Sequence, residues 1–151
     1  MLNLQLYFQD DPILRQPTSI VDYKEEGLKD LIEEMIKLTK TKNGIGLAAP
    51  QVGIPKKLII VKDIENDIFL EMLNPEIVWT SYDKDYKNEG CLSIVIEDKP
   101  VTKSIWRYNR IRVKWQDQNG LEHEELIKDR LLSRIIQHEI DHLNGKLIID
   151  Y

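Results

Sequence analysis

Two stretches of the chain repeat hydrophobic residues every three or four positions, which is the spacing of an amphipathic helix. The first covers residues 24–41, and Asn43-Gly44 follows it as a stop signal. Its apolar positions are Leu28, Leu31, Ile32, Met35, Ile36 and Leu38. The second stripe, near the end of the chain, consists of Leu131, Leu132, Ile135, Ile136 and Ile140. We predict one helix for each stripe.

Between these helices, short runs rich in β-branched and aromatic residues are separated by turn residues, a pattern typical of strands. The runs are residues 57–61, 69–73, 76–79, 92–96 and 111–115. Asp117-Gln118-Asn119-Gly120 then predicts a tight hairpin before a strand at 121–127, because Asn-Gly accepts the positive φ of such turns. The order helix, strands, helix indicates an α+β fold with mostly antiparallel β-sheets.

Length and charge narrow the class of protein. A chain of 151 residues can bury a core of its own, and no repeat or linker divides it, so we expect a single domain over residues 1–151. Acidic residues number 26 against 21 basic ones, which disfavours a nucleic-acid surface. The N-terminal segment lacks a basic start, and no apolar run approaches the roughly 18 residues of a membrane span. We therefore expect a cytoplasmic protein without direct nucleic-acid or membrane binding.

Two histidines near the end of the second predicted helix carry the first chemical signal. His138 and His142 are four positions apart with Glu139 between them. On a helix this spacing places both imidazoles on one face, where they can bind a single metal ion. Glu139 then lies beside the ion, where it can handle the proton of a bound water. The alternative is a pair of ordinary polar histidines at the end of a core helix, and the pattern alone leaves it open.

A metal site of this kind needs a third ligand, and residues 143–151 are too few to hold the usual third ligand of a metallopeptidase. A thermolysin-like peptidase takes a carboxylate from a later helix, for which there is no room, and a metzincin takes a histidine where this chain has Ile148. Upstream, the candidates are Cys91 and His123. We favour Cys91 because a glycine precedes it and a strand-like run follows, whereas His123 alternates like an exposed strand residue. One cysteine and two histidines leave a fourth position for water, as a catalytic site requires.

Three segments together resemble the peptide deformylase family, and they stand in the family's order. They are Gly44-Ile45-Gly46-Leu47-Ala48-Ala49-Pro50-Gln51, Glu89-Gly90-Cys91-Leu92-Ser93 and Gln137-His138-Glu139-Ile140-Asp141-His142-Leu143-Asn144-Gly145. The N-terminal Asp11-Pro12-Ile13-Leu14-Arg15 also resembles the family's opening, so the similarity covers nearly the whole chain. The resemblance implies antiparallel sheets packed around a central, metal-binding C-terminal helix, with the amphipathic helix nearer the N-terminus.

The resemblance also implies a role for each matching residue. Cys91, His138 and His142 match the family's metal ligands, and Glu139 matches the general base that takes a proton from metal-bound water and later delivers one to the departing amine. Gln51 and the backbone N–H of Leu92 match the donors that stabilise the oxyanion. Residues matching the peptide groove and the methionine pocket are Ile45, Gly46, Glu89, Gly90, Leu131 and Ile135. For Gln51, a bracing amide is the plain alternative, and for the apolar residues it is core packing.

The family reaction removes the formyl group from the N-formylmethionine that begins newly made bacterial-type polypeptides, an N-terminal processing step of protein biosynthesis. The resemblance implies one divalent metal ion, Fe²⁺ in the cell, with Zn²⁺, Ni²⁺ or Co²⁺ able to replace it in preparations; the ligand types fit both iron and zinc. The partners to expect are N-formylmethionyl nascent peptides and, transiently, the ribosome. We expect a monomer. A general metallopeptidase and a peptide-binding module without turnover are the alternative functions.

Three features depart from the usual family pattern. The Glu-Gly-Cys-Leu-Ser-Ile stretch is followed by residues 95–99 instead of directly by a proline, and the segment up to 105–107 is longer than usual. Arg134 stands where many bacterial relatives have an apolar pocket residue, and we hypothesise that it narrows or polarises the mouth of the pocket. The chain ends at Tyr151, without the usual C-terminal extension, and in this it resembles the short deformylases of bacterial viruses, which act in the host cytoplasm.

Overall fold

The computed structural model describes residues 2–151. Its α-helices are α1 (Leu28–Thr41) and α2 (Arg130–Leu143). Its strands are β1 (Gly46–Ala48), β2 (Leu58–Asp63), β3 (Ile68–Thr80), β4 (Lys84–Ile96), β5 (Lys99–Tyr108), β6 (Ile111–Gln116) and β7 (Glu122–Ile127). Three short 3₁₀ turns complete the list of elements: η1 (Pro12–Arg15), η2 (Ala49–Val52) and η3 (Ile148–Asp150).

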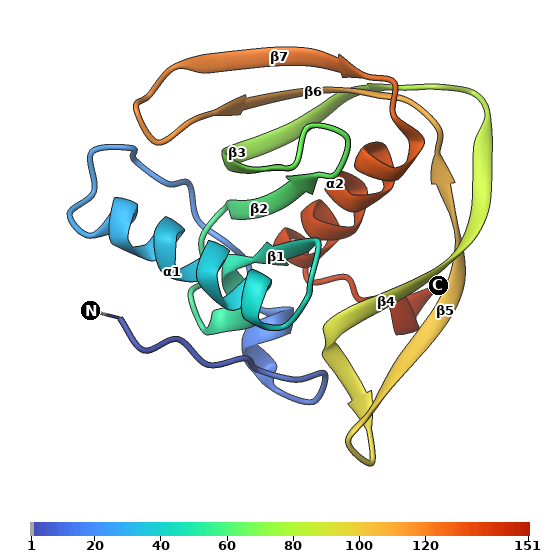
Figure 1. The fold of residues 1–151 in the computed structure, drawn as a ribbon, viewed down its shortest axis with the longest axis horizontal. Helices are drawn as coiled ribbons and strands as arrows, with labels where there is room; N and C mark the ends of the chain where they lie inside the picture. Colours follow the sequence, from blue (N-terminus) through green and yellow to red (C-terminus); the bar gives the residue numbers. More distant parts are fainter. Residues whose placement is uncertain (1) are drawn as a thin grey trace.

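Five strands form one antiparallel sheet in the order β1-β2-β3-β6-β7, with the two helices on opposite faces (Figure 1). The alternation of side chains along β2 accounts for this arrangement. Ile59 and Val61 pack in the cluster that includes α2, while Leu58 and Ile60 pack in the cluster that includes α1. All four of these side chains are fully buried, so β2 contributes to the hydrophobic core on both faces of the sheet.

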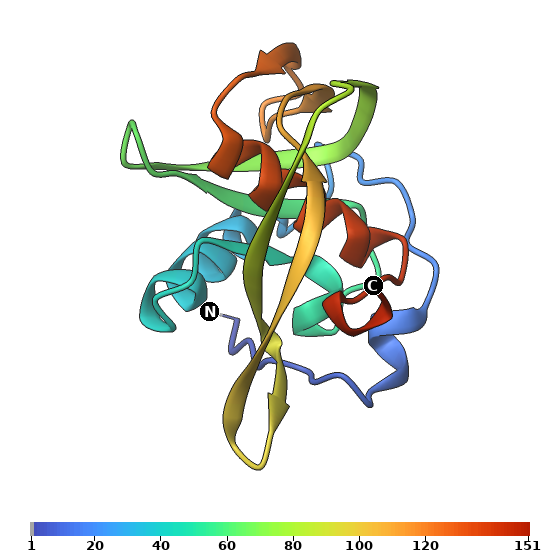
Figure 2. The ribbon, with the colours of Figure 1, turned by 90° about the vertical axis from the view of Figure 1, so that its right-hand side faces the viewer.

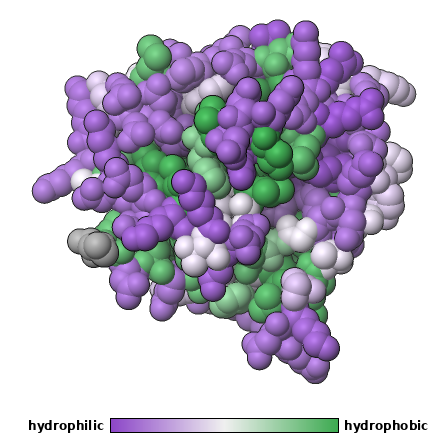
Figure 3. Space-filling model, in the orientation of Figure 1, coloured by the Kyte–Doolittle hydropathy of each residue, from purple (hydrophilic) through white to green (hydrophobic). Residues whose placement is uncertain are grey.

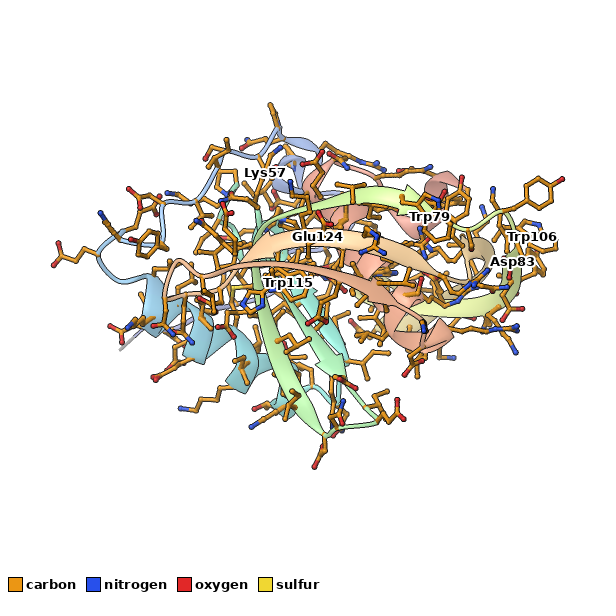
Figure 4. The ribbon with its side chains drawn as sticks, turned by 90° about the horizontal axis from the view of Figure 1, so that it is seen from above. Lys57, Trp79, Asp83, Trp106, Trp115 and Glu124 are labelled. Atoms are coloured by element: carbon orange, nitrogen blue, oxygen red, sulfur yellow. The ribbon has the colours of Figure 1, made fainter. Side chains whose placement is uncertain are left out.

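Strands β4 and β5 form a separate two-stranded ribbon that crosses α2 on the side away from the sheet (Figure 2). Their pairing is interrupted between Gly90 and Val95, which leaves the backbone of residues 91–94 outside the ladder with β5. Figure 4 shows Trp79, Asp83 and Trp106 at the end of the molecule where β3 passes into the ribbon. The helix α2 is thus held between the sheet and the ribbon.

Local sequence explains where α2 begins and ends. Its N-cap is Asp129, whose carboxylate accepts hydrogen bonds from the backbone N–H groups of Leu131 and Leu132 at 2.8 and 3.3 Å. After the last helical residue, the chain turns at Gly145, whose φ of 71° suits glycine. Both histidines of α2 are buried, which is unusual for polar residues and points to a specific use.

The expected α+β fold with antiparallel sheets is confirmed, and the differences are local. The first helix begins at Leu28, after residues 23–27 have formed turns. The runs 69–73 and 76–79 belong to the single strand β3, which continues through a bulge at Asn74 and Pro75. The sequence patterns missed two strands, β1 and β5, and the segment after Ile94 folds as the tip of the β4–β5 ribbon.

The surface agrees with the polar composition. Hydrophilic residues cover most of the face seen in Figure 3, and hydrophobic residues are visible in patches among them. Within residues 2–151, neither α-helix is long and apolar enough to span a membrane.

Candidate metal centre and active site

The three candidate metal ligands meet between the ribbon and α2. Cys91 comes from β4 at the point where its pairing with β5 is interrupted, and His138 and His142 lie one turn apart on α2. One ligand atom from each side chain lies within 4.8 Å of the other two, and the sulfur of Cys91 is 3.3 Å from Nε2 of His142. A thiolate and two imidazoles at this separation fit a tetrahedral divalent ion with one further position open.

Neighbouring groups set the protonation of the two histidines. Nδ1 of His138 lies 2.9 Å from Oε1 of Glu89, so that a proton on Nδ1 is held there and Nε2 is left as the ligand atom. Burial by itself lowers the pKa of His138, but its hydrogen bonds with Cys91 and Glu89 raise it to about 10, so a metal ion that binds here displaces the proton from Nε2. Burial lowers the pKa of His142 well below its usual value, and the charge of His138 adds to this effect. His142 is therefore held as the neutral imidazole that a metal requires.

Glu139 is buried beside the ligands and carries an oxygen without a partner. Its Oε1 lies 3.8 Å from Nε2 of His138, and within residues 2–151 no group hydrogen-bonds its Oε2. Burial raises the pKa of Glu139 to about 7, against the opposing effect of the charge on His138. A carboxyl group with a pKa near neutrality can both accept and donate a proton at physiological pH. The unpartnered oxygen is a buried hydrogen-bond acceptor that faces no donor among residues 2–151.

Gly46 allows β1 to pass directly over this carboxylate. A Cβ atom at position 46 would lie 2.7 Å from Oε1 of Glu139, closer than such atoms approach one another in proteins. A side chain at position 46 would therefore force the carboxylate of Glu139 to shift. Gly90 differs, since a Cβ there would meet only Thr102, at 3.7 Å.

The amide of Gln51 is fixed by hydrogen bonds on both sides. Its Oε1 accepts from the N–H of Ala48 at 2.9 Å, and its Nε2 donates to Oγ of Ser93 at 3.0 Å and lies 3.6 Å from the sulfur of Cys91. Because the carbonyl side of the amide is already bonded, the NH₂ group faces the ligand cluster. Gln51 thus braces the loop and presents a neutral donor to the site at the same time.

A cavity of about 390 Å³ opens beside these groups. Of the residues assigned to the site from the sequence, all but His142 line it: Ile45, Gly46, Gln51, Glu89, Gly90, Cys91, Leu92, Leu131, Ile135, His138 and Glu139. A larger hollow of about 540 Å³ lies between the start of α1 and the β6–β7 turn, and none of the candidate ligands line it. The smaller cavity is therefore the candidate active site, because the possible metal ligands Cys91 and His138 line it.

Glu89 does more than line the cavity, and sequence reasoning missed its main partner. Arg107 donates to both carboxylate oxygens, from Nε at 2.8 Å and from Nη2 at 2.9 Å. Burial by itself raises the pKa of Glu89, but the hydrogen bonds from Arg107 and His138 outweigh it and lower the pKa to about 2. The signal available in the sequence was an arginine between Ile105 and Tyr108 at an inward position of a strand, and that strand was not predicted.

Arg134 contributes a second cation to the same carboxylate. Its Nη1 lies 2.6 Å from Oε2 of Glu89 and 2.9 Å from the carbonyl oxygen of Ile105, and its Nη2 lies 2.7 Å from the carbonyl oxygen of Asp85. The guanidinium is thus bonded to protein acceptors inside the site, although the residue also lines the cavity. Its influence on the pocket mouth stays a prediction.

His123 lies apart from the ligand cluster. Its Nε2 is 2.9 Å from a carboxylate oxygen of Asp117, and its ring stacks on Trp115 with a centroid distance of 4.9 Å. The described residues that could together hold a metal are Cys91, His138 and His142.

Comparison with known proteins adds to this geometry. The family model described as polypeptide deformylase matches residues 4–151. The chain belongs to the peptide deformylase family. Peptide deformylase 1 of Clostridium perfringens is 41% identical, with 97% of this chain and 95% of that protein covered. The resemblance inferred from the sequence is therefore confirmed, and the chain is an enzyme of a family that removes N-formyl groups from nascent peptides.

Solved deformylase structures share the fold. A probable peptide deformylase from Synechococcus phage S-SSM7 superposes with a TM-score of 0.89 at 36% identity, with 99% of each chain covered. The class I type b peptide deformylase of Acinetobacter baumannii, solved with Met-Ala-Ser bound, superposes with a TM-score of 0.90 at 30% identity over the whole of both chains. The similarity to a viral deformylase expected from the sequence is confirmed by the first of these.

Proposed function

We propose that this chain hydrolyses the formamide bond of N-formylmethionyl peptides, using one divalent metal ion held by Cys91, His138 and His142. The observation that carries the proposal is the convergence of the three ligand atoms within 4.8 Å, next to the buried Glu139. When bound, a divalent ion acidifies a water molecule and polarises the formyl carbonyl. The donor types suit Fe²⁺ and Zn²⁺, and we propose Fe²⁺ as the metal used in the cell.

Glu139 moves the proton in this proposal. Its Oε2 accepts a proton from the attacking water, whose oxygen forms a bond to the formyl carbon. When the carbon–nitrogen bond breaks, Glu139 delivers that proton to the departing amine, and the products are formate and a peptide with a free N-terminus. Burial raises the pKa of this carboxyl in the metal-free protein, which favours its holding the proton between the two transfers.

Gln51 and Leu92 stabilise the negative charge that develops on the formyl oxygen. The NH₂ group of Gln51 faces the sulfur of Cys91, and its orientation is set by the bond from Ala48. The backbone N–H of Leu92 follows Cys91 in the part of β4 that is not paired with β5. Donors fixed before the reaction need no reorganisation as charge develops, and this is the source of their effect on rate.

The cavity accounts for recognition of methionine. Ile45, Leu131 and Ile135 provide apolar walls, and an unbranched thioether side chain gains most from such a slot. Gly46 and Gly90 offer backbone beside the cavity, where a peptide can lie as an added strand. The A. baumannii relative was solved with Met-Ala-Ser bound, which supports binding of a methionyl peptide here. We propose nascent chains in a bacterial cytoplasm as the substrates, met by a monomer in transient contact with the ribosome.

The first experiment compares three peptides in the absence of oxygen with protein loaded with Fe²⁺. Formyl-Met-Ala-Ser is expected to release formate rapidly, while formyl-Leu-Ala-Ser and acetyl-Met-Ala-Ser react slowly. The Glu139→Ala variant should bind metal and lose turnover. Comparable cleavage of the acetyl peptide would favour a broader amidase or peptidase, and binding of the formyl peptide without release of formate would favour the binding-module alternative.

A further inference from the structure

A series of hydrogen bonds connects His138, through Glu89 and Arg107, to Tyr151. The first bonds join His138 to Glu89 and Glu89 to Arg107. Arg107 then donates from Nη1 to a carboxylate oxygen of Asp141 at 2.6 Å and to the phenol oxygen of Tyr151 at 2.8 Å. The phenol of Tyr151 donates to the same oxygen of Asp141 at 2.5 Å. The side chains come from β4, β5, α2 and the segment after η3.

Because the guanidinium of Arg107 is rigid, contacts at one end of it can fix the position of Glu89 at the other end. Arg107 is buried and uses all three of its nitrogens, two on Glu89 and the third on Asp141 and Tyr151. Because the group is planar, the bonds at Nη1 fix the plane in which Nε and Nη2 meet Glu89. Oxygen Oε1 of Glu89 in turn accepts from both Arg107 and His138. Arg134 holds only Oε2 of Glu89, so a rotation of Arg107 would still move Oε1, the acceptor that holds the imidazole of His138.

Tyr151 is well suited to lock Arg107 in place. Its ring lies 4.9 Å from the guanidinium carbon, so the cation contacts both the face of the ring and the phenol oxygen. Burial raises the pKa of the phenol, and the hydrogen bond to Asp141 raises it further, so the phenol keeps its proton and remains a donor.

The segment that carries Tyr151 has other anchors. Leu147 and Ile148 are buried in a cluster with Leu14, and Asp150 pairs with Arg15 through contacts of 2.5 and 3.0 Å. The phenol hydroxyl is thus not needed to keep this segment on the protein. Its particular contribution is the pair of bonds to Asp141 and Arg107.

We propose that Tyr151 and Asp141 are positioning residues of the metal centre, which fix Arg107 and, through Glu89, the orientation of the ligand His138. This inference rests on the proposed metal-dependent function. It differs from a tethering role in one respect: removal of the phenol hydroxyl changes the environment of His138, whereas removal of another anchor of the same segment does not.

The test compares Tyr151→Phe with Arg15→Gln, which cuts the ion pair to Asp150 and leaves the Arg107 contacts intact. Tyr82→Phe, at a fully exposed tyrosine, controls for loss of a phenol hydroxyl. Two quantities are measured: the zinc dissociation constant, by competition with a chelator, and the NMR signal of the Nδ1 proton of His138 in the metal-free protein. Thermal unfolding reports stability for every variant.

Tyr151→Phe should weaken zinc binding about three- to tenfold, less than the roughly 10–100-fold cost of losing a direct partner of a ligand. It should also shift or broaden the Nδ1 signal, while Arg15→Gln lowers the melting temperature, leaves the Nδ1 signal unchanged and does not weaken zinc binding, since it removes a positive charge that acts on His142. Asp141→Asn, which keeps the shape of the side chain, should follow Tyr151→Phe.

Two results would overturn the positioning role. The first is a Tyr151→Phe variant whose zinc dissociation constant and Nδ1 signal equal those of the wild-type protein. The second is an equal change of these two quantities in Tyr151→Phe and Arg15→Gln, which would show that Tyr151 only tethers the segment. Failure of the wild-type protein to bind zinc would instead contradict the proposed function. In that case the Nδ1 signal of the metal-free variants still decides the question of positioning.

Discussion

At the scale of single residues, the site depends on how closely backbone approaches the reacting groups. Gly46 and Gly90 both border the cavity, yet a Cβ atom would approach Glu139, the proposed general base, only at position 46. A methyl group at position 46 would meet Oε1 of Glu139 at 2.7 Å. The two glycines therefore predict different kinetic effects for the same substitution.

Gly46→Ala should lower kcat by about 100-fold, because a displacement of the proton-transferring carboxylate by a fraction of an ångström disrupts its alignment with substrate. In Gly90→Ala, the added methyl group would lie 3.7 Å from Thr102, so the variant should fold normally. Its effect should be a higher KM, because the peptide substrate is proposed to lie beside this residue. Steady-state kinetics on formyl-Met-Ala-Ser separate the two, with thermal melts to show that both variants fold. A wild-type kcat for Gly46→Ala would mean that Glu139 moves aside without cost.

At the scale of elements, the β4–β5 ribbon supplies Glu89 and Cys91 from one strand and Arg107 from the other. Its tip is a tight turn in which Glu97 and Asp98 have φ values of 51° and 62°. Both residues occupy the left-handed region, which is unfavourable for most side chains and which Asn-Gly accepts most readily. The turn residues of the ribbon are therefore not those that stabilise it best.

Replacing Glu97-Asp98 by Asn-Gly should raise the free energy of unfolding by about 1 kcal/mol, since both residues then suit a positive φ. For a protein of this length the melting temperature would rise by about 2–4 °C. Asp98→Ala is the matched control, because alanine keeps the unfavourable backbone conformation, and it should give no gain. A double variant that melts at or below the wild-type temperature would show that the acidic side chains make contributions beyond their backbone conformation.

Comparison of the predicted with the observed elements shows which features could be predicted from the sequence. Cys91, His138 and His142 were found because ligand chemistry restricts the choice to few residue types, and the two histidines are joined by the regular spacing of a helix. The role of Arg107 was not predicted, because its partners Glu89 and Asp141 are distant in the sequence and its strand mixes polar with apolar residues. β1 is only three residues long, and Asn74-Pro75 suggested a break where β3 passes through a bulge. Contacts between distant segments were beyond the reach of local patterns.

At the scale of the whole molecule, the buried carboxylate of Glu89 links folding to pH. Its pKa falls from an ordinary value of 4.5 to about 2 in the folded protein. A carboxyl whose pKa is lower in the folded state stabilises the protein fully above its unfolded pKa, and the contribution is lost as the pH falls through the folded pKa. The lowering corresponds to a contribution on the order of 3 kcal/mol.

Urea unfolding of the metal-free protein should therefore show stability falling steeply between about pH 5 and pH 2. Glu89→Gln, which cannot titrate, should be less stable near neutrality and show a shallower dependence in this range. Because this variant can fail to fold, NMR titration of the Glu89 carboxyl in the wild-type protein gives an independent measurement. An unshifted carboxyl pKa would show that Arg107 and His138 do not hold Glu89 ionised.

The position of α2 has a consequence for how the enzyme tolerates change. The helix that carries His138, Glu139 and His142 also supplies Leu132, Ile136 and Leu143 to the main hydrophobic cluster. Its amide protons should therefore exchange with solvent only when the whole protein opens, unlike those of an active site built on surface loops. Substitutions in the core around α2 should therefore lower both the catalytic rate and the stability of the fold. Selection for activity then also preserves the stability.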